Sequence, residues 1–528
     1  MIRTAFAAGS AIAITLAVSW QPAFAQGEPD QRLGRVHFDT SCNEEAQRRF
    51  DRAMRYQHSF WYRESKAIFE EALKADPECA IAYWGIALSL LNNPHAPPPT
   101  ENLPVGLAAL QKAKALGAKT QREGDYIDAL LVFYTDYDKI DHRTRVQAYV
   151  KAMESLAQRY ASDDEAQIEY AISLNVGASP TDKTYANQLK GAAILEPIFK
   201  RQPQHPGVAH YLIHLYDYPP IAEKGLDAAK RYAQIAPAAP HAQHMPSHIF
   251  TRVGYWKESI DSNTASLRSA KADKEWDDGM HGMDYLVYAH LQLGQDKAAR
   301  AVVDEMSTTE GYKRFAGYYA RAAAEARYVV ERGDWKAAAQ LQPRQSPVAY
   351  ADAVTYFARA LGAARSGQPA AAKADIAKLI ELRDKLREAK DAYWSEIVDI
   401  QAQVATAWTL LAEGKHDAAL AAMSAASDLE DKTEKHPVTP GPLAPARELY
   451  GAMLLDRGMA KEALVAFQAT LKKEPHRLGA TLGAAKAAEK LGDAAQAQQY
   501  YADVTALTST ADPVRPEIAE ARAFLQRK

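Results

Sequence analysis

Ala444–Arg477 reads APARELYGAMLLDRGMAKEALVAFQATLKKEPHR, and the segment that follows, Leu478–Ala511, reads LGATLGAAKAAEKLGDAAQAQQYYADVTALTSTA. The two segments align without a gap, and the matched positions are Gly458 with Gly492, Ala463 with Ala497, and Phe467 with Tyr501. Small residues let two helices touch, an aromatic ring fills the space between them, and glycine permits the turn. The pattern predicts a helix–turn–helix unit that must stack on neighbours, because one helix pair cannot bury its apolar face alone.

With glycine at repeat position 15, alanine at 20, an aromatic residue at 24 and Pro475 at 32, these units resemble the tetratricopeptide repeat (TPR). The resemblance covers most of residues 46–511, strongly in the last two units and loosely before them. It implies an all-α fold, an α-solenoid that forms a right-handed superhelix of antiparallel helix pairs. It also implies a role in protein interaction, with repeat positions 2, 5, 9, 12 and 13 of each first helix facing a concave groove.

The repeats and the proline-rich interruptions between them predict how the 528 residues are organised. The predicted segments are a signal peptide at 1–25, a polar lead-in at 26–45, degenerate TPR-like helix pairs at 46–203, histidine-rich units at 204–305, further TPR-like helix pairs at 306–427, a polar loop at 428–443, two regular units at 444–511 and a capping helix at 512–528.

The first 25 residues are typical of an export signal. Arg3 gives a positive start, a short apolar run follows, and Ala23–Ala25 supplies small residues for cleavage after Ala25. The apolar run is too short to span a bilayer comfortably, although a retained N-terminal anchor is the alternative. We therefore expect an exported protein without a transmembrane span in its mature chain, located in a bacterial periplasm, or else secreted.

The two cysteines bracket the first predicted helix pair, Cys42 before it and Cys79 after it. Because the helices of a pair are antiparallel, its two ends lie together, and the thiols can meet. In an oxidising compartment an isolated pair of cysteines favours a disulfide. A redox pair is the alternative, but the spacing is not C-x-x-C.

Charge and motifs give no support to several classes of function. Lys and Arg number 63 and Asp and Glu number 66, so nothing indicates nucleic acid or an anionic membrane as partner. The sequence contains no G-x-S-x-G, no G-x-x-x-x-G-K-[ST], no H-E-x-x-H and no C-x-x-C-H motif. No complete catalytic set is visible, and the sequence does not predict an enzyme.

Eight of the fifteen histidines lie between His205 and His290. In the repeat frame His210 and His214 take positions 5 and 9 of one first helix, and His244 and His248 take the same positions of the next. Residues four apart share a helix face, so each pair presents two imidazoles to one side. Neutral imidazoles suit zinc, copper, iron or nickel, and those of neighbouring helices can converge on a single ion. If a metal binds, zinc or copper is the candidate, with these four histidines as ligands. The alternative is that the histidines line a groove for a peptide or organic ligand.

Other polar residues share the groove in the same frame. His241 and His281 occupy position 2 of their helices, Asp284 occupies position 5, and Arg252 at position 13 is placed to bind a carboxylate. The remaining groove candidates are Asp217, Tyr218 and Tyr255, and a weaker cluster is His58, Trp84 and His95. His205 is assigned to a turn and His290 to packing between helices. Pro246 either delays the start of its helix or kinks it inside the histidine cluster.

Two functions remain open. The first is an interaction module that binds an envelope protein or peptide through its concave face. The second is a transition-metal-binding protein, or a metal-dependent enzyme with Asp217, Asp284 or Glu258 as base. The export signal, the cysteine pair and HPGVAHYLIH…HMPSHIFTRVGYW together are similar to a group of exported bacterial TPR proteins. That similarity implies the architecture and no particular activity.

Overall fold

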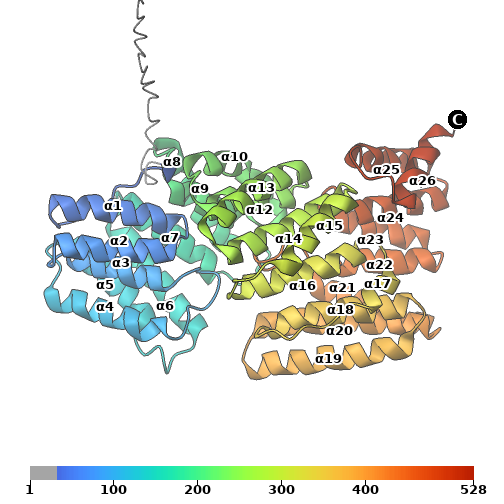
Figure 1. The fold of residues 1–528 in the computed structure, drawn as a ribbon, viewed down its shortest axis with the longest axis horizontal. Helices are drawn as coiled ribbons and strands as arrows, with labels where there is room; N and C mark the ends of the chain where they lie inside the picture. The colour runs from blue at the N-terminus through green and yellow to red at the C-terminus, as the bar shows by residue number, and fades with distance from the viewer. Residues whose placement is uncertain (1–31, 528) are drawn as a thin grey trace, which may run out of the picture.

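The computed structural model describes residues 32–527, and within that range every regular element is helical (Figure 1). The predicted signal peptide and its cleavage after Ala25 lie outside the described residues. No helix in the described range is both long and apolar enough to cross a membrane.

The helices follow one another with short connections. The first half of the described chain holds α1 (Glu44–His58), α2 (Tyr62–Ala75), α3 (Ala80–Leu90), α4 (Asn102–Leu116), α5 (Gln121–Tyr134), α6 (His142–Arg159), α7 (Asp164–Gly177), α8 (Ala186–Arg201), α9 (Pro206–Tyr216), the 3-10 helix η2 (Pro219–Gly225), α10 (Leu226–Ile235), α11 (Pro240–His244), α12 (Pro246–Arg252) and α13 (Trp256–Asp273). The second half holds α14 (Trp276–Gln292), α15 (Asp296–Thr308), α16 (Phe315–Val330), α17 (Trp335–Ala339), α18 (Ala349–Arg365), α19 (Pro369–Glu388), α20 (Ala392–Ala412), α21 (His416–Glu430), α22 (Ala446–Asp456), α23 (Ala460–Lys473), α24 (Leu478–Leu491), α25 (Ala494–Leu507) and α26 (Pro516–Gln526).

Each helix packs mainly on its neighbours in the chain, as α1 does on α2, α18 on α19, and α24 on α25. The fold is therefore the TPR-like α-solenoid that the sequence predicts. The repeat residues have the expected roles: a Cβ on Gly483 would lie 2.3 Å from the ring of Phe467, so only glycine admits the aromatic residue there. Gly458 and Gly492 end their helices at φ +77° and +75°, a conformation that favours glycine.

The end of the solenoid packs against its middle, so the superhelix is closed rather than open. Figure 1 shows α24 beside α15. The indole nitrogen of Trp256 donates to the carbonyl of His476 at 3.0 Å, and the guanidinium of Arg515 binds the Asp296 carboxylate at 2.6 Å with both side chains buried. These contacts join residues about 220 positions apart.

The segment before α1 is packed, which corrects the expectation of a polar lead-in at 26–45. Leu33 and Phe38 are fully buried, and the Phe38 ring lies 5.0 Å from that of Phe50 and 5.6 Å from that of Trp84. Apolar side chains alternate with polar ones in this segment, so its overall polarity concealed them. Trp84 belongs to this aromatic core and takes no part in a cluster with His95.

The connection between α21 and α22, residues 431–445, lies inside the superhelix. The predicted loop at 428–443 corresponds to it, although its first residues belong to α21. Arg327 of α16 is fully buried and donates to Thr439 Oγ1 at 2.7 Å, Gly441 O at 2.8 Å and Pro442 O at 2.9 Å. Its Nε also binds Asp284 Oδ1 at 3.0 Å. One side chain thus donates hydrogen bonds to two buried backbone carbonyls of the loop, which would otherwise need water as a partner.

Cys42 and Cys79 form a disulfide, which confirms the prediction from their spacing. Cys42 lies just before α1, and Cys79 precedes the first residue of α3. Their Cα atoms are 5.1 Å apart, within the ordinary range for a bridge. The bond fastens the start of the packed N-terminal unit to its second helix pair.

Replacing both cysteines (Cys42→Ser with Cys79→Ser) should lower the free energy of unfolding of the N-terminal unit by about 3–4 kcal/mol, because a loop of this size is no longer closed in the unfolded chain. Thermal unfolding with and without reductant measures the effect. Reductant should destabilise the natural chain and leave the double variant unchanged. Equal sensitivity of both proteins would contradict a stabilising disulfide.

Arg327→Ala should cost about 3–5 kcal/mol of stability, because it leaves Asp284 buried without its charged partner. It should also expose residues 431–445 to limited proteolysis. Arg300→Ala is the matched control, because both side chains of the Arg300–Asp304 ion pair are exposed. Loss of this ion pair should lower the free energy of unfolding by less than about 1 kcal/mol. Equal unfolding midpoints for the two variants would show that Arg327 does not anchor the loop.

Candidate metal centre

Six histidines from α9, α11, α12 and α14 form two adjacent groups of three. The first histidine group is His210, His214 and His241, and the second histidine group is His244, His248 and His281. Within each group the candidate ligand nitrogens lie within 4.8 Å of one another. The groups are neighbours, because the ring centroids of His214 and His248 are 6.2 Å apart.

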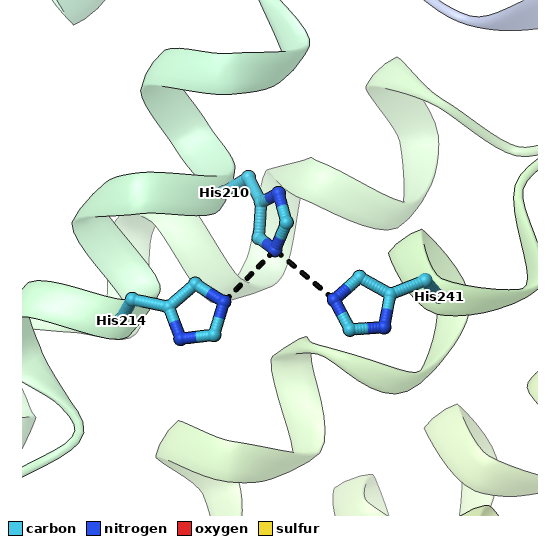
Figure 2. A group of neighbouring side chains, drawn as sticks. All are labelled: His210, His214 and His241. Carbon is cyan, nitrogen blue, oxygen red and sulfur yellow. Dashed lines mark hydrogen bonds between the residues drawn. The ribbon is translucent and has the colours of Figure 1, made fainter. Parts of the chain in front are cut away.

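In the first histidine group, the His210 ring lies between the other two (Figure 2). Its Nδ1 is 2.7 Å from the carbonyl oxygen of His58, which can only accept, so Nδ1 carries the proton and Nε2 presents a lone pair. That Nε2 lies 3.0 Å from His214 Nε2 and 3.1 Å from His241 Nε2. One lone pair forms one good hydrogen bond, so proton sharing cannot satisfy both contacts. A cation bound by all three nitrogens would use every lone pair.

In the second histidine group, the hydrogen bonds determine more clearly which imidazole nitrogens lack a proton. His244 Nδ1 lies 2.6 Å from Asn263 Oδ1, and the Asn263 amide nitrogen donates to Ser259 O at 2.7 Å, so the histidine must be the donor. His248 Nδ1 donates to Asp217 Oδ2 at 2.9 Å. In the neutral imidazoles neither Nε2 atom therefore carries a proton, yet the two face each other at 3.0 Å. The Tyr285 hydroxyl is 3.5 Å from His248 Nε2 but lies closer to the carbonyl oxygens of Pro437 and Thr439. A metal ion between the two Nε2 atoms removes this repulsion.

The nitrogen separations fit a shared ion. Two imidazole nitrogens bound at the usual zinc distance are about 2.9–3.4 Å apart for angles from a right angle to tetrahedral. The observed contacts of 3.0 and 3.1 Å lie within that range. His281 completes the second group, and its Nδ1 is buried with no hydrogen-bond partner among the described residues.

Burial keeps these imidazoles neutral. It lowers the pKa of His210 to about 3 and that of His244 to about 3. The neutral imidazole is the form that binds metals.

A third cluster of similar composition needs no ion. His205 Nδ1 accepts from the backbone nitrogen of Val208 at 3.3 Å, so its Nε2 donates to Glu165 Oε1 at 2.8 Å. His58 Nε2 lies 3.0 Å from Glu165 Oε2, and its Nδ1 lies 3.0 Å from the Tyr211 hydroxyl, which can donate to it. Every donor here has an acceptor. The cluster fixes His58, whose carbonyl in turn orients His210, and His205 caps the start of α9.

Asp217 supports the second histidine group from behind. It accepts from His248 and from Arg252 Nε at 2.7 Å, and Lys435 Nζ of the interior loop lies 3.5 Å away. Burial alone would raise the pKa of Asp217, but the positive charges of Lys435 and Arg252 outweigh it and hold that pKa well below its usual range. A carboxylate on the far nitrogen of a ligand histidine fixes the ring and makes it more basic.

Pro246 breaks its helix inside the cluster, the second of the two outcomes open from the sequence. α11 ends at His244 and α12 begins at Pro246. The break separates His244 from His248, yet both belong to the second histidine group, and His241 and His244 of α11 belong to different groups. The four predicted ligands are neighbours, but they divide between the two groups, two in each.

Several other predicted residues lie elsewhere. Asp284 is fully buried against Arg327. Tyr255 is 41% exposed, Glu258 lies on the outer surface of α13, and His290 binds Gln295 Oε1 at 2.7 Å, apart from both groups. The two carboxylates proposed as bases within the groove, Asp217 and Asp284, are both committed to cationic partners.

The sequence did not single out several residues that belong to the centre. His281 was placed in the groove by its repeat position but not assigned as a ligand. Asn263 and Lys435 act through other side chains, and His436 lies on the interior loop. No repeat position marks a residue in a loop, so only the proximity of such residues in space reveals them.

The sequence matches no family model and no curated protein. Among solved structures the chain is similar to yeast Tom70 (13% identity, 92% of this chain and 95% of that chain, TM-score 0.29) and to an IFIT1 monomeric mutant (11%, 85% and 90%, 0.35). It is also similar to the TPR domain of P58(IPK), at 13% identity over 72% of this chain and 98% of that chain, with a TM-score of 0.21. These likenesses carry no argument about function. The chain's own helix packing defines its class, an all-α helical-repeat protein.

If the second histidine group binds a metal ion, Asn263→Ala should lower the affinity for that ion about 10–100-fold, because it removes the acceptor that fixes the His244 tautomer. Asn263→Asp is the matched variant: it keeps an acceptor oxygen at the same place and should retain affinity. Competition against a chromogenic zinc chelator measures both. Equal affinities for the alanine and aspartate variants would show that the Nδ1 hydrogen bond does not support a metal ligand.

Proposed function

We propose that this protein binds two transition-metal ions side by side, one in each histidine group, with zinc or copper as the metal. The observation that carries the proposal is the pair His244 and His248, whose Nδ1 protons are held by Asn263 and Asp217 while their bare Nε2 atoms face each other at 3.0 Å. Ligand sets made entirely of imidazole suit these metals and not magnesium or calcium.

The number of protein ligands at each ion distinguishes a structural site from a catalytic one. Each group offers three nitrogens, and zinc sites with three protein ligands keep a fourth position for water or substrate. His214, His241, His248 and His281 also line one cavity, so those open positions face a common space. This arrangement favours a reactive centre over a purely structural one.

An interaction module for an envelope protein or peptide was the other function open from the sequence. The concave face beside the histidines is filled by the chain itself, since residues 431–445 bind Asp217, Tyr285 and Arg327 there. A protein or peptide partner would have to use another surface of the solenoid. Export to the periplasm remains part of the proposal, supported by the leader sequence and compatible with the disulfide.

Elemental analysis of untagged protein, purified without chelator, should find about two ions per chain. His214→Ala and His244→Ala should each reduce the content to about one, because each removes a ligand from a different group. His290→Ala is the matched control and should keep both ions. Added zinc at a hundred times its Kd should stabilise the metal-free protein by about 2.7 kcal/mol.

Less than about a tenth of an ion per chain, with no thermal shift from zinc or copper, would refute the metal centre. A loss of metal from His290→Ala as large as from His244→Ala would show that the ions bind elsewhere.

A further inference from the structure

A chamber lies against both histidine groups. It has a volume of about 310 Å³, and its imidazole floor is His214, His241, His248 and His281. Two loops roof it, the proline-rich loop between α3 and α4 and the interior loop 431–445, which contribute His95 and His436. His95, Phe315 and His436 also line a larger neighbouring cavity of about 900 Å³.

Much of the chamber wall is formed by aromatic, proline and aliphatic side chains: Phe60, Phe315, Pro97, Pro99, Pro437 and Val438. Tyr62, Asn92 and Asn93 add polar groups to the lining. Arg314 and Asp278 also line the chamber. They pair with each other, because the Arg314 guanidinium donates to the Asp278 carboxylate at 3.2 Å. A strongly charged ligand would find no free partner here except the ions themselves.

Phe60 holds an unusual conformation at this wall. Its φ is +57°, in the left-handed region that a bulky side chain rarely adopts. The result is that its ring lies over the first histidine group, 5.1 Å from the His241 ring at an interplanar angle of 23° and 5.6 Å from the His214 ring at 26°. The backbone amides of Phe60 and Trp61 donate to the carbonyls of Gln57 and Tyr56, so the end of α1 sets this conformation and with it the direction of the ring.

His95 adds a free hydrogen-bonding atom. Its Nε2 is buried without a hydrogen-bond partner among the described residues, and its ring centroid lies 4.5 Å from that of His214. A buried nitrogen left unpaired beside a ligand histidine is costly unless something that enters the chamber binds it.

We infer that the chamber binds a small aromatic alcohol, a phenol or catechol, and this inference rests on the proposed metal centre. The ring suits the aromatic and proline walls, and the hydroxyl oxygen suits both an open position of an ion and the free nitrogen of His95. The volume is in the range of pockets for small organic ligands.

The test uses the full-length mature protein loaded with zinc, which has no redox chemistry, so binding is observed without turnover. 4-Nitrocatechol is the probe, since its absorption shifts when its oxygens bind a metal. We expect saturable binding at least about tenfold tighter than to the metal-free protein, with zinc retained after gel filtration. Phenol and catechol should displace the probe, whereas cis-1,2-cyclohexanediol, which has similar size but no flat ring, should not.

Two variants locate the probe. His95→Ala should weaken its binding about tenfold, the usual loss for one hydrogen bond to a charged group, and Phe60→Leu should also weaken it. Both variants should keep about two zinc ions per chain, as is also expected of His290→Ala. A protein with two zinc ions that does not bind the probe, or that binds the diol equally well, would overturn the aromatic ligand and leave the metal centre standing. A protein without zinc would overturn the metal centre itself.

Discussion

The centre of this molecule depends on three hydrogen bonds that fix the positions of imidazole protons. The His58 carbonyl, Asn263 Oδ1 and Asp217 Oδ2 each accept an Nδ1 proton, from His210, His244 and His248 respectively. Because a neutral imidazole has one proton, each bond leaves a bare Nε2 on the inner side. The contrasting cluster around Glu165, in which every donor has an acceptor, shows that proximity of histidines alone is no sign of a metal site.

Distant parts of the chain supply that arrangement. The His58 carbonyl comes from the end of the first helix, Asn263 from α13, and Asp217 from the residue after α9. The interior loop adds Lys435, which helps to keep Asp217 ionised, and Arg327 holds the same loop in place. The stability of the loop and the electrostatics of the centre are therefore coupled through buried side chains. A change at Arg327 should be felt at the histidines although the two do not touch.

Repeat periodicity made much of this predictable from the sequence. Glycine and aromatic positions predicted the helix pairs, and histidines at positions 5 and 9 were expected to share a wall; the structure has them in two neighbouring groups. The division into two groups was not predictable, because it depends on which imidazoles meet in space: His241 and His244 lie three residues apart on α11 and belong to different groups. Nor were the roles of His95, His436 and Phe60, since loops have no period and a positive φ at a phenylalanine has no signature in sequence. Leu33 and Phe38 were hidden by the polar residues around them.

Closure of the superhelix restricts how such a protein can evolve. An open solenoid can gain or lose a unit at modest cost, because each unit contacts only its neighbours. Here Arg515 must meet Asp296, and Trp256 must meet the carbonyl of His476. Inserting or deleting a helix pair between these points would move one partner by the width of a repeat and separate both contacts. Between Trp256 and Arg515 the number of helix pairs is thus constrained by these contacts, whereas side chains and outward-facing loops can change there without separating the contacts.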